Sequence, residues 1–143
     1  MNGRSLLFLT LLALGGFALY RAFSPDTSDP ATVIEKYLNH WKTGNGASIY
    51  LLISTDAKSK LRDNGIRNAV AYHSYFSDSH RDLRGWKMES QRIGVTTARF
   101  VATLSFTNIV GKQMTDRASF YVVREGDSWR VDGWEMSNVY ALP

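Results

Sequence analysis

Apolar residues recur every three or four positions in the first half of this chain and every second position in its last third. The clearest helical face, between residues 30 and 43, consists of Val33, Ile34, Tyr37, Leu38 and Trp41. Asp29 suits the N-cap of this helix, Pro30 suits its first position, and Gly44 is a natural stop. The pattern therefore predicts a first helix that begins at Pro30 and ends before Gly44.

Three shorter helical segments are predicted after that glycine. They cover residues 46–53, about 56–61 after the cap Ser54-Thr55, and 66–75. The polar stretch 77–85 is expected to be a loop.

The period changes to two at Trp86. Residues 86–90, 95–107, 113–124 and 128–136 alternate apolar with polar side chains, which predicts four half-buried strands. Turns at Gly111-Lys112 and at Glu125-Gly126-Asp127 separate the last three. Helices followed by an antiparallel meander indicate an α+β domain with the helices on one face of the sheet.

A membrane-targeting segment precedes the domain. The uncharged run from Ser5 to Tyr20 lies between Arg4 and Arg21 and spans about 24 Å as a helix, against about 30 Å for a bilayer core. That length is close to a signal-peptide apolar region, but no clean small-x-small cleavage site follows. If Arg21 snorkels outward, the span extends to Phe23 and an uncleaved anchor is possible. We favour a retained anchor over residues 5–23; removal would give a secreted or periplasmic protein.

The expected organisation is a signal-anchor or signal peptide at residues 1–23, a linker at 24–29 and one α+β domain at 30–143. The leading segment with Arg4 favours the cytoplasmic side, which places the domain outside the cytoplasm. The linker is too short to hold that domain far from the bilayer.

Composition narrows the possible chemistry. Without Arg4 and Arg21 the chain has 15 basic and 13 acidic residues and no long basic run, so nucleic-acid binding is not expected. The absence of cysteine excludes disulfides, thiol nucleophiles and cysteine metal sites.

The opening helix PATVIEKYLNHWKTGN, the short helix after a glycine and the ending GDSWRVDGWEM resemble the nuclear transport factor 2-like superfamily, over roughly residues 29–136. The ending is similar to that of many exported bacterial-type members of uncharacterised function. The resemblance implies helices packed inside a strongly curved, cone-like antiparallel sheet. Because the superfamily contains isomerases, dehydratases and cyclases as well as members without catalysis, it does not settle the function.

An enzyme would need an acid or base inside the cone. Candidates are His73, Tyr72 and Tyr75 from the helices, and Asp116 or Asp132 from the strands. His73 and Asp132 are the foremost of these. No acid–base pair with an oxyanion donor can be assembled from them, so we predict no catalytic set.

No metal or cofactor site is expected. His73, His80, Asp78 and Asp82 lie near one another in sequence, but their spacing fits no zinc or calcium pattern and favours a solvated loop. His40 is interpreted as a charge at the C-terminus of the first helix.

Aromatic residues give the remaining candidates. A ligand cavity or partner surface is assigned to Tyr37, Trp41, Tyr72, Tyr75, Tyr121 and Trp134. By strict alternation Tyr121 faces away from Phe120, and Trp134 away from Val131. Tyr121 and Trp134 are therefore expected to be exposed and to mark a surface for a protein partner or a second copy.

The sequence thus favours a non-catalytic extracytoplasmic domain, anchored in the membrane, that binds a partner protein or a small apolar ligand. The alternative is a small-molecule isomerase or cyclase that uses a cavity histidine or aspartate.

Overall fold

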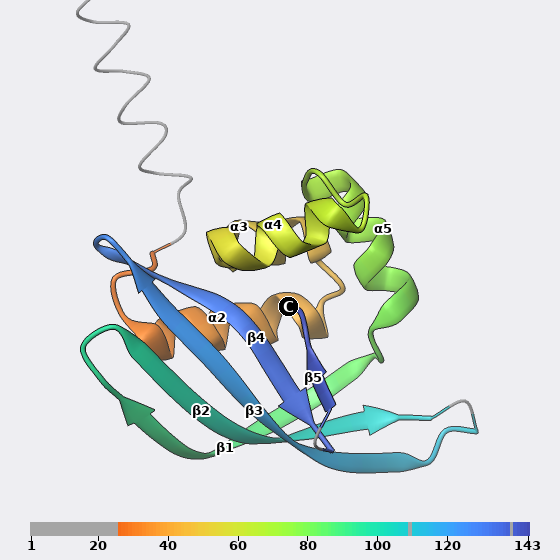
Figure 1. Ribbon diagram of the computed structural model, residues 1–143. Helices are drawn as coiled ribbons and strands as arrows, with labels where there is room; N and C mark the ends of the chain where they lie inside the picture. The colour runs from red at the N-terminus through yellow and green to blue at the C-terminus, as the bar shows by residue number, and fades with distance from the viewer. Residues whose placement is uncertain (1–25, 109, 138) are drawn as a thin grey trace, which may run out of the picture.

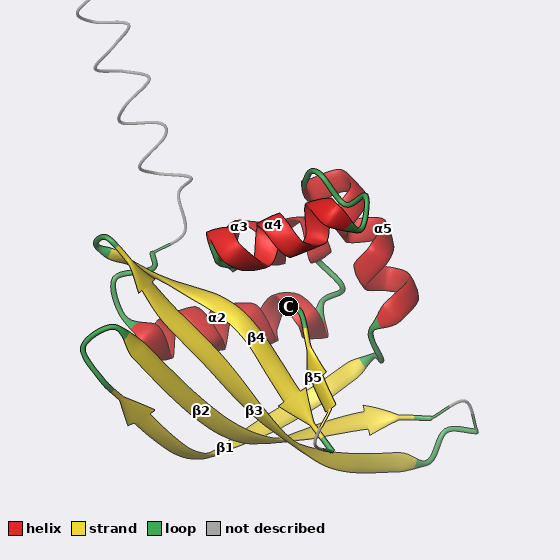
Figure 2. Ribbon diagram, in the orientation of Figure 1, coloured by secondary structure: helices red, strands yellow, loops and turns green. Residues whose placement is uncertain are grey.

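The computed structural model describes residues 26–108, 110–137 and 139–143, and places helices before strands. Figures 1 and 2 show the helices α2 (Pro30–Lys42), α3 (Gly46–Leu52), α4 (Thr55–Asp63) and α5 (Ala69–Ser79), followed by the strands β1 (Leu83–Ile93), β2 (Thr97–Thr107), β3 (Gln113–Glu125), β4 (Ser128–Met136) and β5 (Val139–Ala141). The expected α+β class is confirmed.

The sheet is an antiparallel meander in which each strand pairs with the next, in the order β1-β2-β3-β4-β5. The prediction of four strands was wrong by one, because the three residues of β5 are too few to show an alternating pattern. Strand β1 is also longer than expected: it begins at Leu83, within the stretch assigned to a loop.

Each helix begins at a side chain that accepts a hydrogen bond from a backbone N–H of its first turn. Asp29 accepts from Thr32, and Ser54 accepts from Ala57, which confirms both predicted caps. Asn68 accepts from Ala71, so α5 begins three residues later than the predicted helix at 66–75.

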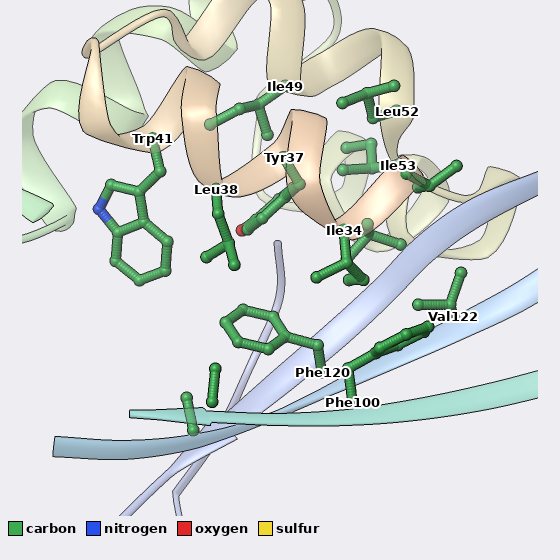
Figure 3. Packing of buried hydrophobic residues seen from close by; sticks show 14 of the residues in the cluster. Ile34, Tyr37, Leu38, Trp41, Ile49, Leu52, Ile53, Phe100, Phe120 and Val122 are labelled. Carbon is green, nitrogen blue, oxygen red and sulfur yellow. The ribbon is translucent and has the colours of Figure 1, made fainter. Parts of the chain in front are cut away.

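Helix α2 lies against the concave face of the curved sheet, as Figure 1 shows. Its predicted apolar face is buried throughout. The inward face of β2 alternates as expected, with Ala98, Phe100, Ala102, Leu104 and Phe106 all buried. Figure 3 shows Ile34 and Tyr37 of α2 above Phe100 and Phe120 of the sheet. This contact between α2 and the sheet forms the centre of the core.

A β-bulge in β4 reverses the expected orientation of Trp134. Tyr121 pairs with Gly133 while the next residue, Val122, pairs with Val131, so Asp132 is an extra residue between them. Beyond the bulge, Trp134 lies opposite Phe120 and faces the concave side with it. The expected outward facing of Trp134 was therefore wrong, because its side chain is half-buried on the inner face. Tyr121 faces away from Phe120 as expected, but its side chain is half-buried and not fully exposed.

The bulged strand is joined to α4 through Ser54. This fully buried serine donates from Oγ to Asp132 Oδ1 at 2.6 Å, and its backbone N–H donates to Val131 O at 2.9 Å. The same Oγ accepts from the Ala57 N–H at 3.0 Å. Ser54 thus caps the helix and fixes it to the sheet.

Ser54→Ala should lower the unfolding free energy by about 2 kcal/mol, because it removes both the cap of the helix and the hydrogen bond that Ser54 donates to Asp132. Urea denaturation at neutral pH measures the change. Ser59→Ala is the matched control, since Ser59 is an exposed position in the same helix and its change should stay below about 0.5 kcal/mol. Equal effects at the two positions would contradict this role of Ser54.

The proposed signal-anchor at residues 1–23 lies outside the described residues. Within the described part of the chain, no helix has the length and apolar character needed to cross a membrane.

Candidate functional site

Seven aromatic side chains meet where α2, α5 with its C-cap residue, and β4 come together. We call them the aromatic cluster: Tyr37, Trp41, Tyr72, Tyr75, Phe76, His80 and Trp134. Trp41 is central, with its ring centroid 5.2 Å from that of His80 and 5.4 Å from that of Trp134. Tyr75, His80 and Trp134 are half-buried, whereas Tyr37 and Tyr72 are fully buried. The cluster therefore extends from the surface into the core.

Local structure places these rings. Tyr72, Phe76 and His80 follow one another at intervals of four residues, so they share the inward side of α5 and its C-cap. Helix α3 approaches α5 closely at Gly46, where an added Cβ would lie 2.9 Å from the Cα of His73. The Trp41 indole Nε1 donates to the carbonyl of Arg81 at 2.8 Å, which ties α2 to the segment after α5.

His80 is a neutral imidazole inside this cluster. Its ring stacks on Phe76 with centroids 4.1 Å apart and meets Trp41 edge to face. Burial among these rings lowers the pKa of His80 to about 4, against a smaller raising effect of the backbone hydrogen bond to Phe76. The side chain is therefore uncharged at neutral pH.

The hydrogen bonds around His80 also assign its tautomer. The Ser79 hydroxyl donates its one hydrogen to the Tyr75 carbonyl at 2.6 Å. Ser79 Oγ also lies 3.0 Å from His80 Nδ1, so Nδ1 carries the proton and donates it to that oxygen. In a neutral ring, Nε2 is then a bare hydrogen-bond acceptor.

Four buried polar atoms of the cluster have no hydrogen-bond partner among the described residues: Tyr37 Oη, Tyr72 Oη, His80 Nε2 and Trp134 Nε1. Burial raises the pKa of both tyrosines above the ordinary range, and the nearby Tyr75 phenol adds to the effect. A weak side-chain hydrogen bond from the Trp134 indole acts in the opposite direction on the pKa of Tyr37, so two of the four atoms lie near each other although no bond of normal geometry joins them. A buried polar atom without a partner costs about 1–3 kcal/mol, so these four atoms make the aromatic cluster the candidate binding site among the described residues.

The structure brings five of the six predicted aromatic candidates together. Tyr37, Trp41, Tyr72, Tyr75 and Trp134 all belong to the cluster. Tyr121 lies on the opposite face of the sheet, where its hydroxyl donates to Glu135 Oε2 at 2.8 Å. That hydrogen bond is the main reason why the pKa of Tyr121 is raised.

The two foremost catalytic candidates lie elsewhere. The side chain of His73 is exposed on α5. Asp132 is the bulge residue that accepts from Ser54, at the N-terminus of α4.

Sequence reasoning missed His80 as a member of the site and did not single out Phe76 among the other aromatic residues. His80 was assigned to a solvated loop, but α5 continues to Ser79 and turns its C-cap residue inward. The signal that could have found both residues is their spacing of four from Tyr72. The Asp132-Gly133 pair could have predicted the inward facing of Trp134, since a glycine inside a strand often marks a bulge and a bulge changes which side chains face inward.

The open face of the sheet has a separate polar groove of about 530 Å³, lined by residues that include Arg99, Arg117 and Glu135. Its charged groups are bonded within the domain: Arg99 Nη2 donates to Ser119 Oγ at 2.9 Å, and Arg117 Nε donates to Glu89 Oε2 at 2.7 Å. These bonds make the groove less suited to a small ligand than the aromatic cluster, with its unpartnered atoms.

In residues 26–108, 110–137 and 139–143, no three His, Asp or Glu side chains gather in a way that could hold a metal ion. His73 and His80 in particular point to different surroundings, one to solvent and one to the cluster.

Comparison of the whole fold finds similar solved structures. A SEC-C motif-containing protein from Rhodopseudomonas palustris superposes with a TM-score of 0.60 over 84% of this chain and 86% of its own, at 11% identity. A protein provisionally named an NTF2-like transpeptidase from Campylobacter jejuni gives 0.45 at 14% identity over 72% of this chain and 96% of its own. A protein provisionally named a calcium/calmodulin-dependent protein kinase II association domain, from Xanthomonas campestris, gives 0.46 at 16% identity over 71% of this chain and 79% of its own. No protein-family model and no curated protein matches the sequence. At these identities the similarity to the Rhodopseudomonas protein concerns the fold alone.

Proposed function

We propose that this chain is a non-catalytic, membrane-anchored domain of nuclear transport factor 2-like type that binds a small uncharged ligand in the aromatic cluster. The observation that carries the proposal is the set of four buried polar atoms without a partner in the described residues. The domain would lie outside the cytoplasm, at the end of the anchor over residues 5–23.

The chemistry of the cluster defines the ligand. Trp134 Nε1 can only donate a hydrogen bond, and His80 Nε2, as the unprotonated nitrogen, can only accept one. A hydroxyl group does both, and the tyrosine hydroxyls can pair with it in either direction. The surrounding rings favour an apolar body, and no cluster residue is charged at neutral pH, so an ionised ligand would lack a counter-charge. We therefore infer a small apolar alcohol as the ligand class.

Cyclohexanol should shift the indole N–H resonance of Trp134 in a two-dimensional NMR titration, whereas methylcyclohexane should not. Trp134→Phe should weaken cyclohexanol binding about tenfold, because it removes one donor and keeps an aromatic ring. The indole of Trp129, buried near Thr27, is the internal control and should not move. Equal binding of the alcohol and the hydrocarbon would contradict the inferred ligand class. If neither binds, the proposed site is wrong.

The anchor has its own test, which is the mature N-terminus of the protein in fractionated cells. An intact Met1–Arg21 segment in the membrane fraction is the expected result. A start after Tyr20 or Ala22 in a soluble fraction would show that the segment is cleaved.

A further inference from the structure

The turn between β1 and β2 presents aliphatic side chains to solvent. Ile93 is 48% exposed and Val95 is 81% exposed. The Gly94 N–H donates to the Thr97 carbonyl at 2.9 Å and closes the turn, so this tip has a defined shape. Neither side chain contributes to the core, which calls for a different explanation of why they are apolar.

This tip lies at the end of the domain where the described chain begins. The Trp129 N–H donates to Thr27 O at 2.7 Å, Trp129 pairs with Arg124, and the Arg124 N–H donates to Thr96 O at 2.8 Å. These contacts connect the N-terminal residues to the β1–β2 turn through the β3–β4 hairpin. Figure 1 shows all three at the same side of the molecule.

The distance to the anchor is short. Thr27 is buried and bonded to Trp129, so the chain is fixed to the domain from that residue on. Three residues lie between Phe23, the expected end of the anchor, and Thr27, so the Cα atoms of Phe23 and Thr27 are at most about 14 Å apart. The end of the domain with the β1–β2 turn is thus kept close to the lipid headgroups.

The charges beside the tip favour anionic lipid. Arg92 and Arg99 lie directly opposite each other in the register of β1 and β2, and like charges in this position repel. Arg99 already donates from Nη2 to Ser119 Oγ and lies over the Tyr121 ring, so a phosphate would have to use the other N–H groups of its guanidinium together with Arg92 to relieve that repulsion. Glu125, at the same end, is already bonded to the backbone and hydroxyl of Thr55. Asp127 is exposed in the neighbouring turn, so the overall attraction is expected to be moderate.

We propose that the β1–β2 turn inserts Ile93 and Val95 into the headgroup layer of the membrane that anchors the chain, with Arg92 and Arg99 on the phosphates of anionic lipids. The proposal rests on the proposed membrane anchoring, because the short tether is what presents the turn to the bilayer. Docking would fix the orientation of the domain relative to the membrane.

The chain has no cysteine, so one introduced thiol gives one labelling site. In the full chain reconstituted into phosphatidylcholine vesicles containing phosphatidylglycerol, Val95→Cys is labelled with the polarity-sensitive fluorophore NBD. The expected result is a blue-shifted emission that lipids with a nitroxide in the upper acyl chain quench at least twofold. Val110→Cys is the matched control, since Val110 is 79% exposed and lies in the turn at the other end of β2. Its emission should remain that of a dye in water.

The outcomes separate the two proposals. If the full chain does not float with the vesicles, the anchoring proposal fails. If the chain floats but the dyes at positions 95 and 110 both emit as they do in water, the proposed docking of the turn is wrong and the anchoring proposal stands. A double variant, Arg92→Ser with Arg99→Ser, should dock equally on vesicles with and without phosphatidylglycerol, whereas the parent prefers the anionic ones. An unchanged preference would overturn the role of the arginine pair.

Discussion

The domain should lose on the order of 3 kcal/mol of its unfolding free energy as the pH falls from about 6.5 to about 4, because of His80. The folded protein holds the pKa of this histidine at about 4, whereas the unfolded chain leaves it near 6.5. Between these values the unfolded state binds more protons than the folded state. The stability that the neutral His80 ring contributes is therefore fully present above pH 6.5, the pKa of this histidine in the unfolded chain. It is lost as the pH falls from 6.5 to about 4.

The surroundings of His80 explain why protonation is unfavourable. The neighbouring rings of Phe76, Trp41 and Trp134 displace water without supplying a negative charge. Arg81 follows in sequence, and its guanidinium lies over the Phe106 ring and 3.9 Å from an Asp116 oxygen. Because no carboxylate belongs to the aromatic cluster, the cost of burying the imidazolium is not offset there.

Urea denaturation at a series of pH values measures this effect, with His80→Gln as the comparison. Partial burial also lowers the pKa of His40, so the His80 contribution is the difference between the wild type and the variant. That difference should change by on the order of 3 kcal/mol across the window. His73→Gln is the matched control for the same substitution at an exposed histidine of the same helix. A wild type and a His80→Gln variant with parallel pH profiles would contradict the burial of a neutral histidine.

Phe120→Ala should destabilise the domain by about 3–5 kcal/mol, the range for loss of a fully buried phenylalanine. The ring lies at the centre of β3, with its centroid 6.0 Å from that of Tyr37 on α2. It also lies opposite Trp134 in the register of β3 and β4. Removing it leaves a cavity below the aromatic cluster and between the sheet and α2.

Guanidinium denaturation provides the measurement. Met114→Ala is the control on the same strand, because Met114 is 45% exposed and its loss should cost less than about 0.5 kcal/mol. A cost below about 1 kcal/mol for Phe120→Ala would mean that this side chain is not in the core, and the assigned inward face of β3 would be wrong.

The sequence determined those elements whose own residues repeat a regular period or carry a cap. Helix α2 is one of them, since its apolar face and Asp29 cap are both local features. The inward alternation of β2 is another. In both elements the face that is buried against the rest of the domain is the face that the local pattern marks as apolar. The pattern was therefore sufficient to predict the element and its buried side.

The sequence was insufficient where a single residue changes the periodicity or where a short element depends on its neighbour. The bulge at Asp132 reverses the facing of Trp134, and only the pairing with Tyr121 and Val122 reveals it. Strand β5 exists through its pairing with β4. His80 is similar: its sequence neighbours are polar, and its burial follows from α5 carrying it against Trp41 and Phe76.

The sequence by itself thus established the α+β class, the order of helices and strands, five of the aromatic residues of the site and an apolar N-terminal run that predicts an anchor. Only the tertiary structure decided which faces of β4 and α5 point inward, that a neutral histidine completes the cluster, and that the β1–β2 turn lies at the same end of the domain as Thr27. The physical reason is that periodicity records burial within one element. The partners of a polar atom and the neighbours of a turn are set by elements that are distant in the chain.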